Sequence, residues 1–351
     1  MGPRIGRVMV ATLALLAPAG FGQVSARAAK AGITAPPKYT PPKTAWGDPD
    51  LQGIFTSDDS WGVPFERPKQ FGTRTTLTEQ ELADRAKRID DTLTNVVEEG
   101  NRPATGLGGG PRQAGVDGAP VPSHWGEFAR RASHQTSLIV EPPDGRLPSL
   151  TEEAQQRLAA QRAMRAKRPD SWLDRSLYDR CITRGVAGSA LPVIYGNGSQ
   201  IVQAPGWVAI RYEMVHETRL IPLDGRPHAS AAVRSYTGDP RGHWEGNTLV
   251  VETTNFLGNT TSVAVNGSTG PPASEELKLV ERFTRVAPDA VQYSMTVYDP
   301  QTYAAPWTVS FPITQEPGYE LFEYACHEGN YAMHNLLSAA RAEDKAEKEG
   351  K

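Results

Sequence analysis

The strongest constraint on the fold is a run of short β-type segments in the second half of the chain. Alternating or β-branched apolar residues dominate segments 200–214, 219–223, 248–256, 277–286, 291–298, 307–313 and 321–326. Parallel neighbours would need long crossovers, usually helices, and the short connections between these segments leave no room for them. The sequence therefore predicts a mainly β fold: an antiparallel meander that forms a barrel or a strongly curved sheet, with a few peripheral helices.

Helical patterns flank this β region. Thr78 and Glu81 form a capping box that opens a helix running to about residue 98, and a second helix begins near Thr151. We expect a signal peptide at 1–26, an extended Pro-rich leader and first strand at 27–75, a helical and loop-rich segment packing on the barrel at 76–170, an antiparallel β domain at 171–330 and a helical tail at 331–351.

The N-terminus has the pattern of an export signal. Arg4 and Arg7 precede a short apolar core at 8–17, and small residues follow, which predicts cleavage near Ala26 or Ala28. The alternative is an N-terminal membrane anchor, for which the core is short. No later segment approaches about 20 consecutive apolar residues, so we expect a periplasmic or secreted protein without an integral membrane anchor.

The charge balance argues against a nucleic-acid partner. The net charge is -3, and removal of Arg4 and Arg7 with the signal takes it to -5. Phosphate backbones are bound by dense Lys and Arg, which a mildly acidic chain does not offer. The expected partner is a small-molecule ligand or substrate, and the sequence leaves the oligomeric state open.

Two cysteines, Cys181 and Cys326, stand far apart in the chain. In an oxidising compartment such a pair is expected to form a disulfide. The alternatives are two buried thiols or a pair of metal ligands.

Five sequence blocks resemble those of a family of exported bacterial proteins. They are residues 46–53, 141–146, 222–228, 241–253 and 324–331, which spread over most of the mature chain. The resemblance implies export and carries no assigned activity. The meander also looks lipocalin-like, which is an analogy of fold and not of function.

Charged residues on apolar strand faces are the first candidate site. Side chains alternate along a strand, so Glu281 shares a face with Leu279 and Phe283. Glu252 and Arg211 lie in similar settings on other strands. Burial raises the pKa of a carboxyl group, which suits Glu281 to proton transfer near neutral pH. The alternative is an internal ion pair that fixes strand register.

A second candidate is the polar stretch from Tyr212 to His228. We expect His216 and Glu213 to act in proton transfer and Arg219 to bind negative charge. The remaining candidates for substrate binding are Arg211, Tyr212, Asp224, His228 and Glu252. The alternative is a turn, because Asp224-Gly225-Arg226-Pro227 has turn chemistry.

Motifs for other chemistries are weak or missing. The spacing of His216, His228, His243 and His327 matches no zinc motif such as His-Glu-x-x-His, and there is no Gly-x-Ser-x-Gly elbow. The glycines at 108–110 lack the flanking pattern of a nucleotide loop. We therefore expect no metal and no cofactor.

Aromatic residues on the strands, Trp307 among them, are candidates to line a ligand cavity, although strand aromatics usually belong to a core.

The favoured function is an exported, small-molecule-binding β-barrel protein acting as a cofactor-independent acid–base enzyme: a lyase, isomerase or hydrolase. One alternative is a non-catalytic binder of an apolar or aromatic ligand; another is a carbohydrate-binding or cell-envelope interaction protein. An enzyme needs two titratable groups converging on one enclosed space, whereas a carrier has an apolar cavity with its charges outside.

Overall fold

The computed structural model describes residues 39–100, 113–114, 120–121, 127–193, 195–258, 263 and 270–350. Of residues 95–100, 113–114 and 120–121 it describes the backbone alone. The expected signal peptide, both cleavage positions and the glycines at 108–110 lie outside the described residues.

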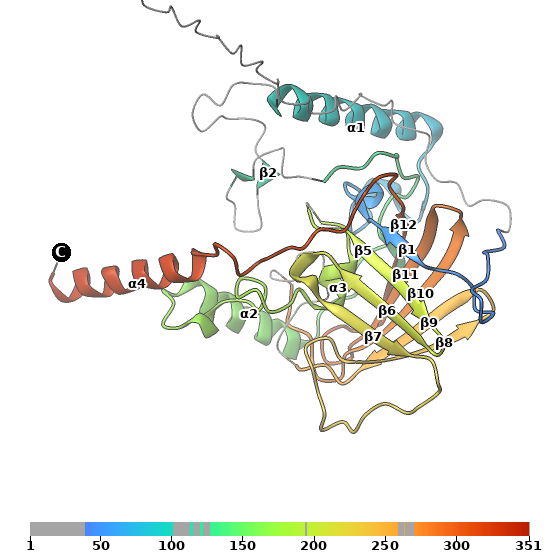
Figure 1. The fold of residues 1–351 in the computed structure, drawn as a ribbon. Helices are drawn as coiled ribbons and strands as arrows, with labels where there is room; N and C mark the ends of the chain where they lie inside the picture. The colour runs from blue at the N-terminus through green and yellow to red at the C-terminus, as the bar shows by residue number, and fades with distance from the viewer. Residues whose placement is uncertain are drawn as a thin grey trace, which may run out of the picture.

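The strands form two antiparallel sheets (Figure 1). The four-stranded sheet has the order β1 (Gly53–Phe55), β5 (Ser199–Ala204), β6 (Trp207–Tyr212), β7 (Thr218–Pro222). The six-stranded sheet has the order β4 (Ile139–Glu141), β12 (Trp307–Thr314), β11 (Ala290–Tyr298), β10 (Lys278–Ala287), β9 (Thr248–Thr254), β8 (Asp239–Glu245). A short hairpin pairs β2 (Gln113–Ala114) with β3 (Pro120–Val121). The prediction of a mainly β, antiparallel fold with few helices is confirmed.

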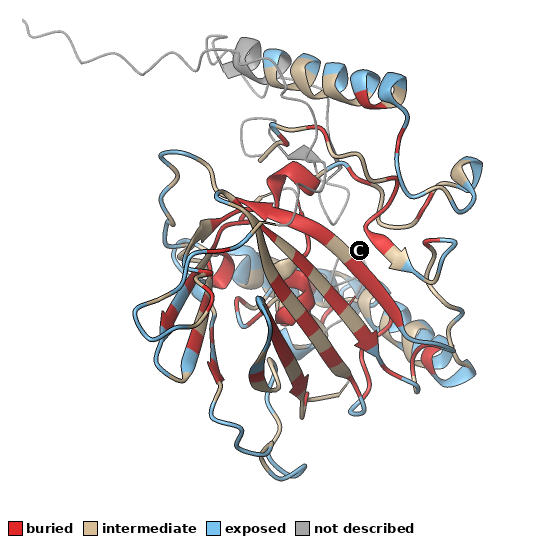
Figure 2. Cartoon of the chain, turned by 90° about the vertical axis from the view of Figure 1, so that its right-hand side faces the viewer, coloured by how far each residue is buried: buried red, intermediate tan, exposed pale blue. Residues whose placement is uncertain are grey.

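Buried and half-buried side chains alternate along strands β10 and β11 (Figure 2). Both sheets turn one apolar face inward, and Val208, Ile210, Val251, Phe283 and Met295 belong to one shared core. At one edge Thr56 and Thr314 exchange two backbone hydrogen bonds, of 2.8 and 2.9 Å. At the other edge a side chain at Gly242 of β8 would collide with Ile221 and Leu223, so β7 and β8 approach closely there.

Four elements differ from the sequence prediction. Segment 200–214 is two strands, because Gly206 takes a positive φ of 77° and turns the chain. Segment 321–326 is not a strand: Phe322 is exposed, and Cys326 is tied to Cys181. The edge strands β4 and β8 were not predicted, since β4 has only three residues and β8 is polar and contains Pro240, which an edge strand tolerates.

Three of the four described α-helices lie outside the sheets (Figure 1), whereas the short helix at 185–190 is buried and gives Val186 and Ala187 to the shared core. The α-helices are α1 (Glu79–Gly100), α2 (Glu152–Ala166), α3 (Gly185–Ala190) and α4 (Ala332–Lys348). Single 3-10 turns occur elsewhere in the chain: η1 (Asp58–Ser60), η2 (Lys69–Phe71), η4 (Trp172–Asp174) and η5 (Met214–His216). The predicted capping box of α1 is present: Glu81 N–H donates to Thr78 Oγ1 at 3.3 Å, and Thr78 N–H donates to Glu81 Oε2 at 2.8 Å. None of the helices in the described ranges is long and apolar enough to cross a membrane.

Candidate functional site

A buried ion pair lies between the two sheets. Arg219 of β7 donates from Nη1 to Glu281 Oε1 at 3.0 Å and from Nη2 to Glu281 Oε2 at 2.5 Å. Tyr293 donates its hydroxyl to Glu281 at 3.1 Å, and Arg219 also donates to Thr253 at 3.1 Å and to Tyr212 at 3.3 Å. The glutamate is 0% exposed and the arginine 3%. Glu281 therefore points inward, as expected from its strand face, and its partner is a cation, which is the internal ion pair given above as the alternative.

The electrostatics of this pair keep Arg219 charged. Burial lowers the pKa of the Arg219 guanidinium, but the negative charge of Glu281 and their hydrogen bonds outweigh it, so the net pKa is raised. Burial raises the pKa of Tyr212 to about 12, so this hydroxyl stays neutral at physiological pH. The pair is therefore equipped to hold the sheets together.

The space beside the ion pair is small. A cavity of about 20 Å³ is lined by Tyr212 and Tyr293 together with Ser57, Ser189, Asn197 and Ser199. Such a volume holds about one water molecule. Trp307, an expected ligand contact, is 0% exposed and packs edge-on against the rings of Phe65 and Tyr303, so it belongs to the core. The expected ligand cavity between the strands does not appear here.

Several other predicted site residues lie on outer surfaces. Arg211 is half-buried on the outward face of β6. Asp224 is exposed and forms an ion pair with Arg226. His228 lies between two carboxylates, with Nδ1 at 3.2 Å from Asp239 and Nε2 at 3.4 Å from Glu252. The structure does not bring these residues together with Glu281.

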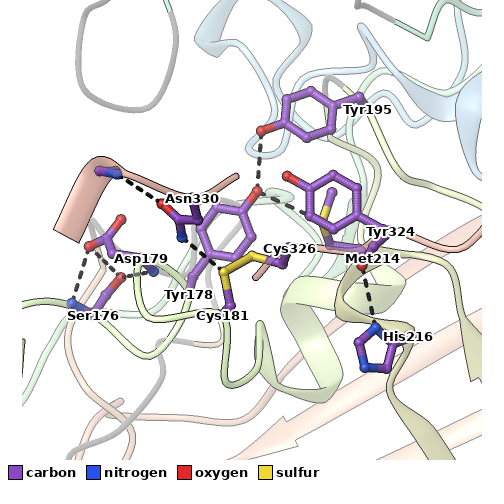
Figure 3. Close-up of a disulfide and its surroundings, with 11 residues drawn as sticks. Ser176, Tyr178, Asp179, Cys181, Tyr195, Met214, His216, Tyr324, Cys326 and Asn330 are labelled. Carbon is purple, nitrogen blue, oxygen red and sulfur yellow. Dashed lines mark hydrogen bonds between the residues drawn. A yellow bond between two sulfur atoms is a disulfide. The ribbon is translucent and has the colours of Figure 1, made fainter. Parts of the chain in front are cut away.

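His216 lies outside strand β6. The strand ends at Tyr212, and Val215 and His216 both adopt positive φ, so the chain turns away before it reaches the histidine. An unbroken strand would place His216 on the face of Tyr212, but the strand ends too early for that. Its ring is exposed, and Nδ1 lies 3.3 Å from the backbone oxygen of Tyr324 (Figure 3).

The disulfide between Cys181 and Cys326 is present, which confirms the predicted pairing. It fastens the segment after β12 to the turn before α3. Tyrosines gather beside it: the hydroxyls of Tyr178 and Tyr195 are 3.2 Å apart, and the rings of Tyr195 and Tyr324 stack at 6.4 Å (Figure 3).

Two carboxylates meet near one end of the sheets. Asn197 donates from Nδ2 to Asp58 at 2.8 Å and from its backbone N–H to Glu127 at 3.0 Å. Burial, and next the charge of Glu127, raise the pKa of Asp58 to about 7. Glu213, a predicted proton-transfer residue, accepts a hydrogen bond from Tyr319, and its pKa is also raised, first by burial. The Asp58–Glu127 pair can therefore hold a proton near neutral pH.

A large concave space lies beside α1 in the described part of the chain. This cleft, which we call the α1 cleft, has a volume of about 440 Å³. Its walls come from α1, from segment 59–77 and from residues 128–133. The apolar lining includes Trp61, Val63, Phe71, Leu77, Ile89 and Phe128. Small-molecule sites commonly have this size and this mostly apolar, aromatic lining.

Most charged groups of the α1 cleft already have partners. Glu81 receives two hydrogen bonds from Arg74, at 2.5 and 2.7 Å. Asp59 accepts backbone N–H bonds from residues 130 and 131 at 3.0 Å. Arg85 donates to the backbone oxygens of residues 133 and 135 at 2.6 and 2.7 Å. The cleft is therefore an apolar space whose charges mostly serve the fold.

Sequence reasoning missed both the α1 cleft and the Asp58–Glu127 pair. The capping box and amphipathic pattern of α1 indicated a helix with one apolar face, but not what that face meets. Among the described residues no group of three His, Cys, Asp or Glu side chains has the arrangement of a metal site.

Comparisons of the chain with protein-family models, curated proteins and solved structures found no match. The function is therefore argued from the site alone.

Proposed function

We propose that the protein binds a small apolar molecule in the α1 cleft. The observation that carries this proposal is the contrast between two spaces. The α1 cleft has about 440 Å³ and an aromatic lining, whereas the cavity between the sheets has about 20 Å³. Only the first volume falls in the range of ligand sites.

The pattern of charges favours a binder over an enzyme. Catalysis would need titratable groups free to exchange protons with a bound molecule. In the α1 cleft Glu81 is held by Arg74, and Asp59 is held by backbone N–H groups. An apolar cleft whose charged groups already have partners within the protein is typical of a carrier.

A second candidate is a cofactor-independent acid–base enzyme, a lyase, isomerase or hydrolase. The Asp58–Glu127 pair favours it, because a carboxyl with a pKa of about 7 both gives and takes protons at neutral pH. Asp59 and Phe128, the next residues in the chain, line the α1 cleft. In this version Asp58 would be the proton donor or acceptor, with Glu213 as a further candidate.

We also propose that the protein works outside the cytoplasm and that its two sheets act as one barrel-like body. The first proposal rests on the export pattern around Arg4 and Arg7 and on the disulfide, which persists in oxidising compartments. The second rests on the Thr56–Thr314 bridge and the close approach of β7 to β8 at Gly242.

A filling substitution tests the binding proposal. Thr92 lines the α1 cleft, and Thr92→Trp would occupy part of it. Lys87 is exposed on the same helix and does not line the cleft, so Lys87→Trp is the matched control. With the neutral dye Nile red as probe, we expect strong fluorescence enhancement by the wild type and by Lys87→Trp, and a clear loss with Thr92→Trp. Equal enhancement by all three proteins would place the apolar site elsewhere.

A further inference from the structure

We propose that the α1 cleft selects an apolar ligand that carries an anionic group, such as an alkyl or aryl carboxylate. This inference rests on the proposed function, because it assumes that the cleft is the binding site. Its starting point is a pair of arginines, Arg85 and Arg88, which lie three residues apart on α1 and both line the cleft.

Neither arginine has a carboxylate partner among the described residues. Arg85 donates to two backbone oxygens, which are neutral, and no ion pair involves Arg88 there. Burial, and next the positive charge of Arg88, lower the pKa of Arg85. The two guanidinium groups are therefore close enough to repel each other, and a bound anion would relieve that repulsion.

The acidic groups of the cleft offset this positive charge only in part. Glu81 pairs with Arg74, and Asp59 lies 3.5 Å from Nε of Arg131, which also pairs with Asp289 at 2.8 Å. Asp84 is exposed at the rim and accepts a hydrogen bond from the amide of Gln80 at 2.9 Å. Arg85 and Arg88 are therefore the two cations of the lining that form no ion pair with a carboxylate among the described residues.

The chemistry of guanidinium defines the ligand class. Its planar fork of N–H donors matches a carboxylate, and charge-assisted hydrogen bonds are stronger than neutral ones. The walls around it are aromatic and aliphatic, with Trp61, Phe71 and Phe128 among them. An apolar body with an anionic end satisfies both parts of this surface, whereas a cationic amphiphile would meet like charges.

Calorimetric titration with three probes of equal chain length tests the inference. The probes are decanoate, 1-decanol and decylammonium, each below its aggregation concentration, added to the full mature chain with its disulfide intact. We expect decanoate to bind about tenfold more tightly than decanol, and decylammonium to bind most weakly. Arg88→Gln should weaken decanoate binding to about the level of decanol and so remove the preference for decanoate. Lys87→Gln, which removes a positive charge outside the cleft, should keep the preference.

The outcomes separate the two proposals. If decanol and decanoate bind equally to the wild type, or if Arg88→Gln leaves the preference intact, the anion inference is overturned and the cleft remains an apolar site. If none of the three probes binds, both proposals are overturned. Arg88 is exposed, so its substitution is expected to leave the urea midpoint of unfolding almost unchanged, and loss of folding does not confuse the result.

Discussion

Arg219 and Glu281 face each other across the space between the two sheets, joined by hydrogen bonds of 3.0 and 2.5 Å. Arg219 belongs to β7 of the four-stranded sheet and Glu281 to β10 of the six-stranded sheet. The pair therefore links the two sheets through charge, beside the hydrogen bond from Arg219 to Thr253 and the backbone bridge between Thr56 and Thr314. No ligand-sized space adjoins it in the described part of the chain, so we assign it to stability.

Glu281→Gln should destabilise the protein strongly. The substitution leaves the buried guanidinium of Arg219 without its counter-charge, which costs about 3–5 kcal/mol. Arg282→Gln on the same strand is the control, because its ion pair with Glu245 is largely exposed and contributes less than about 1 kcal/mol. Urea denaturation measures both. Equal, small effects of the two substitutions would show that Glu281 is not a structural partner.

Removal of the disulfide should lower the free energy of unfolding by up to about 5 kcal/mol, because the bond closes a loop of 145 residues in the unfolded chain. Cys181→Ser with Cys326→Ser removes it without leaving a free thiol. Denaturation of the variant and of the oxidised wild type gives the difference, and peptide mapping without reductant verifies the link. Two alkylatable thiols in protein isolated from the periplasm would contradict the pairing.

The Asp58–Glu127 pair should make stability depend on pH. The folded pKa of Asp58, about 7, lies above its ordinary value of 3.8, so the folded state binds this proton more tightly than the unfolded state. The resulting stabilisation is complete below the ordinary value and is lost as the pH rises through about 7. It amounts to a few kcal/mol.

Asp58→Asn, which resembles the protonated side chain, should remove this dependence. Above pH 7 the variant is expected to be more stable than the wild type, and near pH 4 the two should be similar. Glu127→Gln should shrink the dependence in part, because the charge of Glu127 is the second cause of the shift after burial. Urea titrations from pH 4 to 8 supply the comparison, and parallel profiles for wild type and Asp58→Asn would refute the coupling.

His216→Ala should leave the protein nearly unchanged. The ring is exposed and makes one contact, with the backbone oxygen of Tyr324. Surface changes of this kind usually alter the free energy of unfolding by less than about 0.5 kcal/mol. Denaturation and Nile red binding check this expectation. A large loss of binding with normal stability would indicate that His216 belongs to the functional site, and it would favour the acid–base enzyme over the carrier.

Local sequence patterns predicted what depends on local geometry. The inward direction of Glu281 follows from the alternation of side chains along β10, and its need for a cation follows from the cost of burying a charge. The capping box of α1 was readable for the same reason, since its partners are three residues apart.

Contacts between residues far apart in the chain could not be predicted from local sequence patterns. The α1 cleft joins Trp61, Ile89 and Phe128, which are far apart in the chain and carry no shared motif. Asp58 and Glu127 are also far apart in the chain, and both accept hydrogen bonds from Asn197. The misplacement of His216 has a local cause, because the positive φ angles of Val215 and His216 interrupt a strand pattern that the residue types alone would continue.

Under the proposed function, ligands enter the α1 cleft and not the space between the sheets. The decisive measurement is anomalous diffraction at the bromine absorption edge from a crystal of the full mature chain soaked with a bromine-labelled alkyl carboxylate. We predict an anomalous peak in the α1 cleft among Trp61, Ile89 and Phe128, with the carboxylate at Arg88. A peak between the two sheets near Tyr212 and Tyr293, or an α1 cleft left without bromine at saturating ligand, would contradict the account.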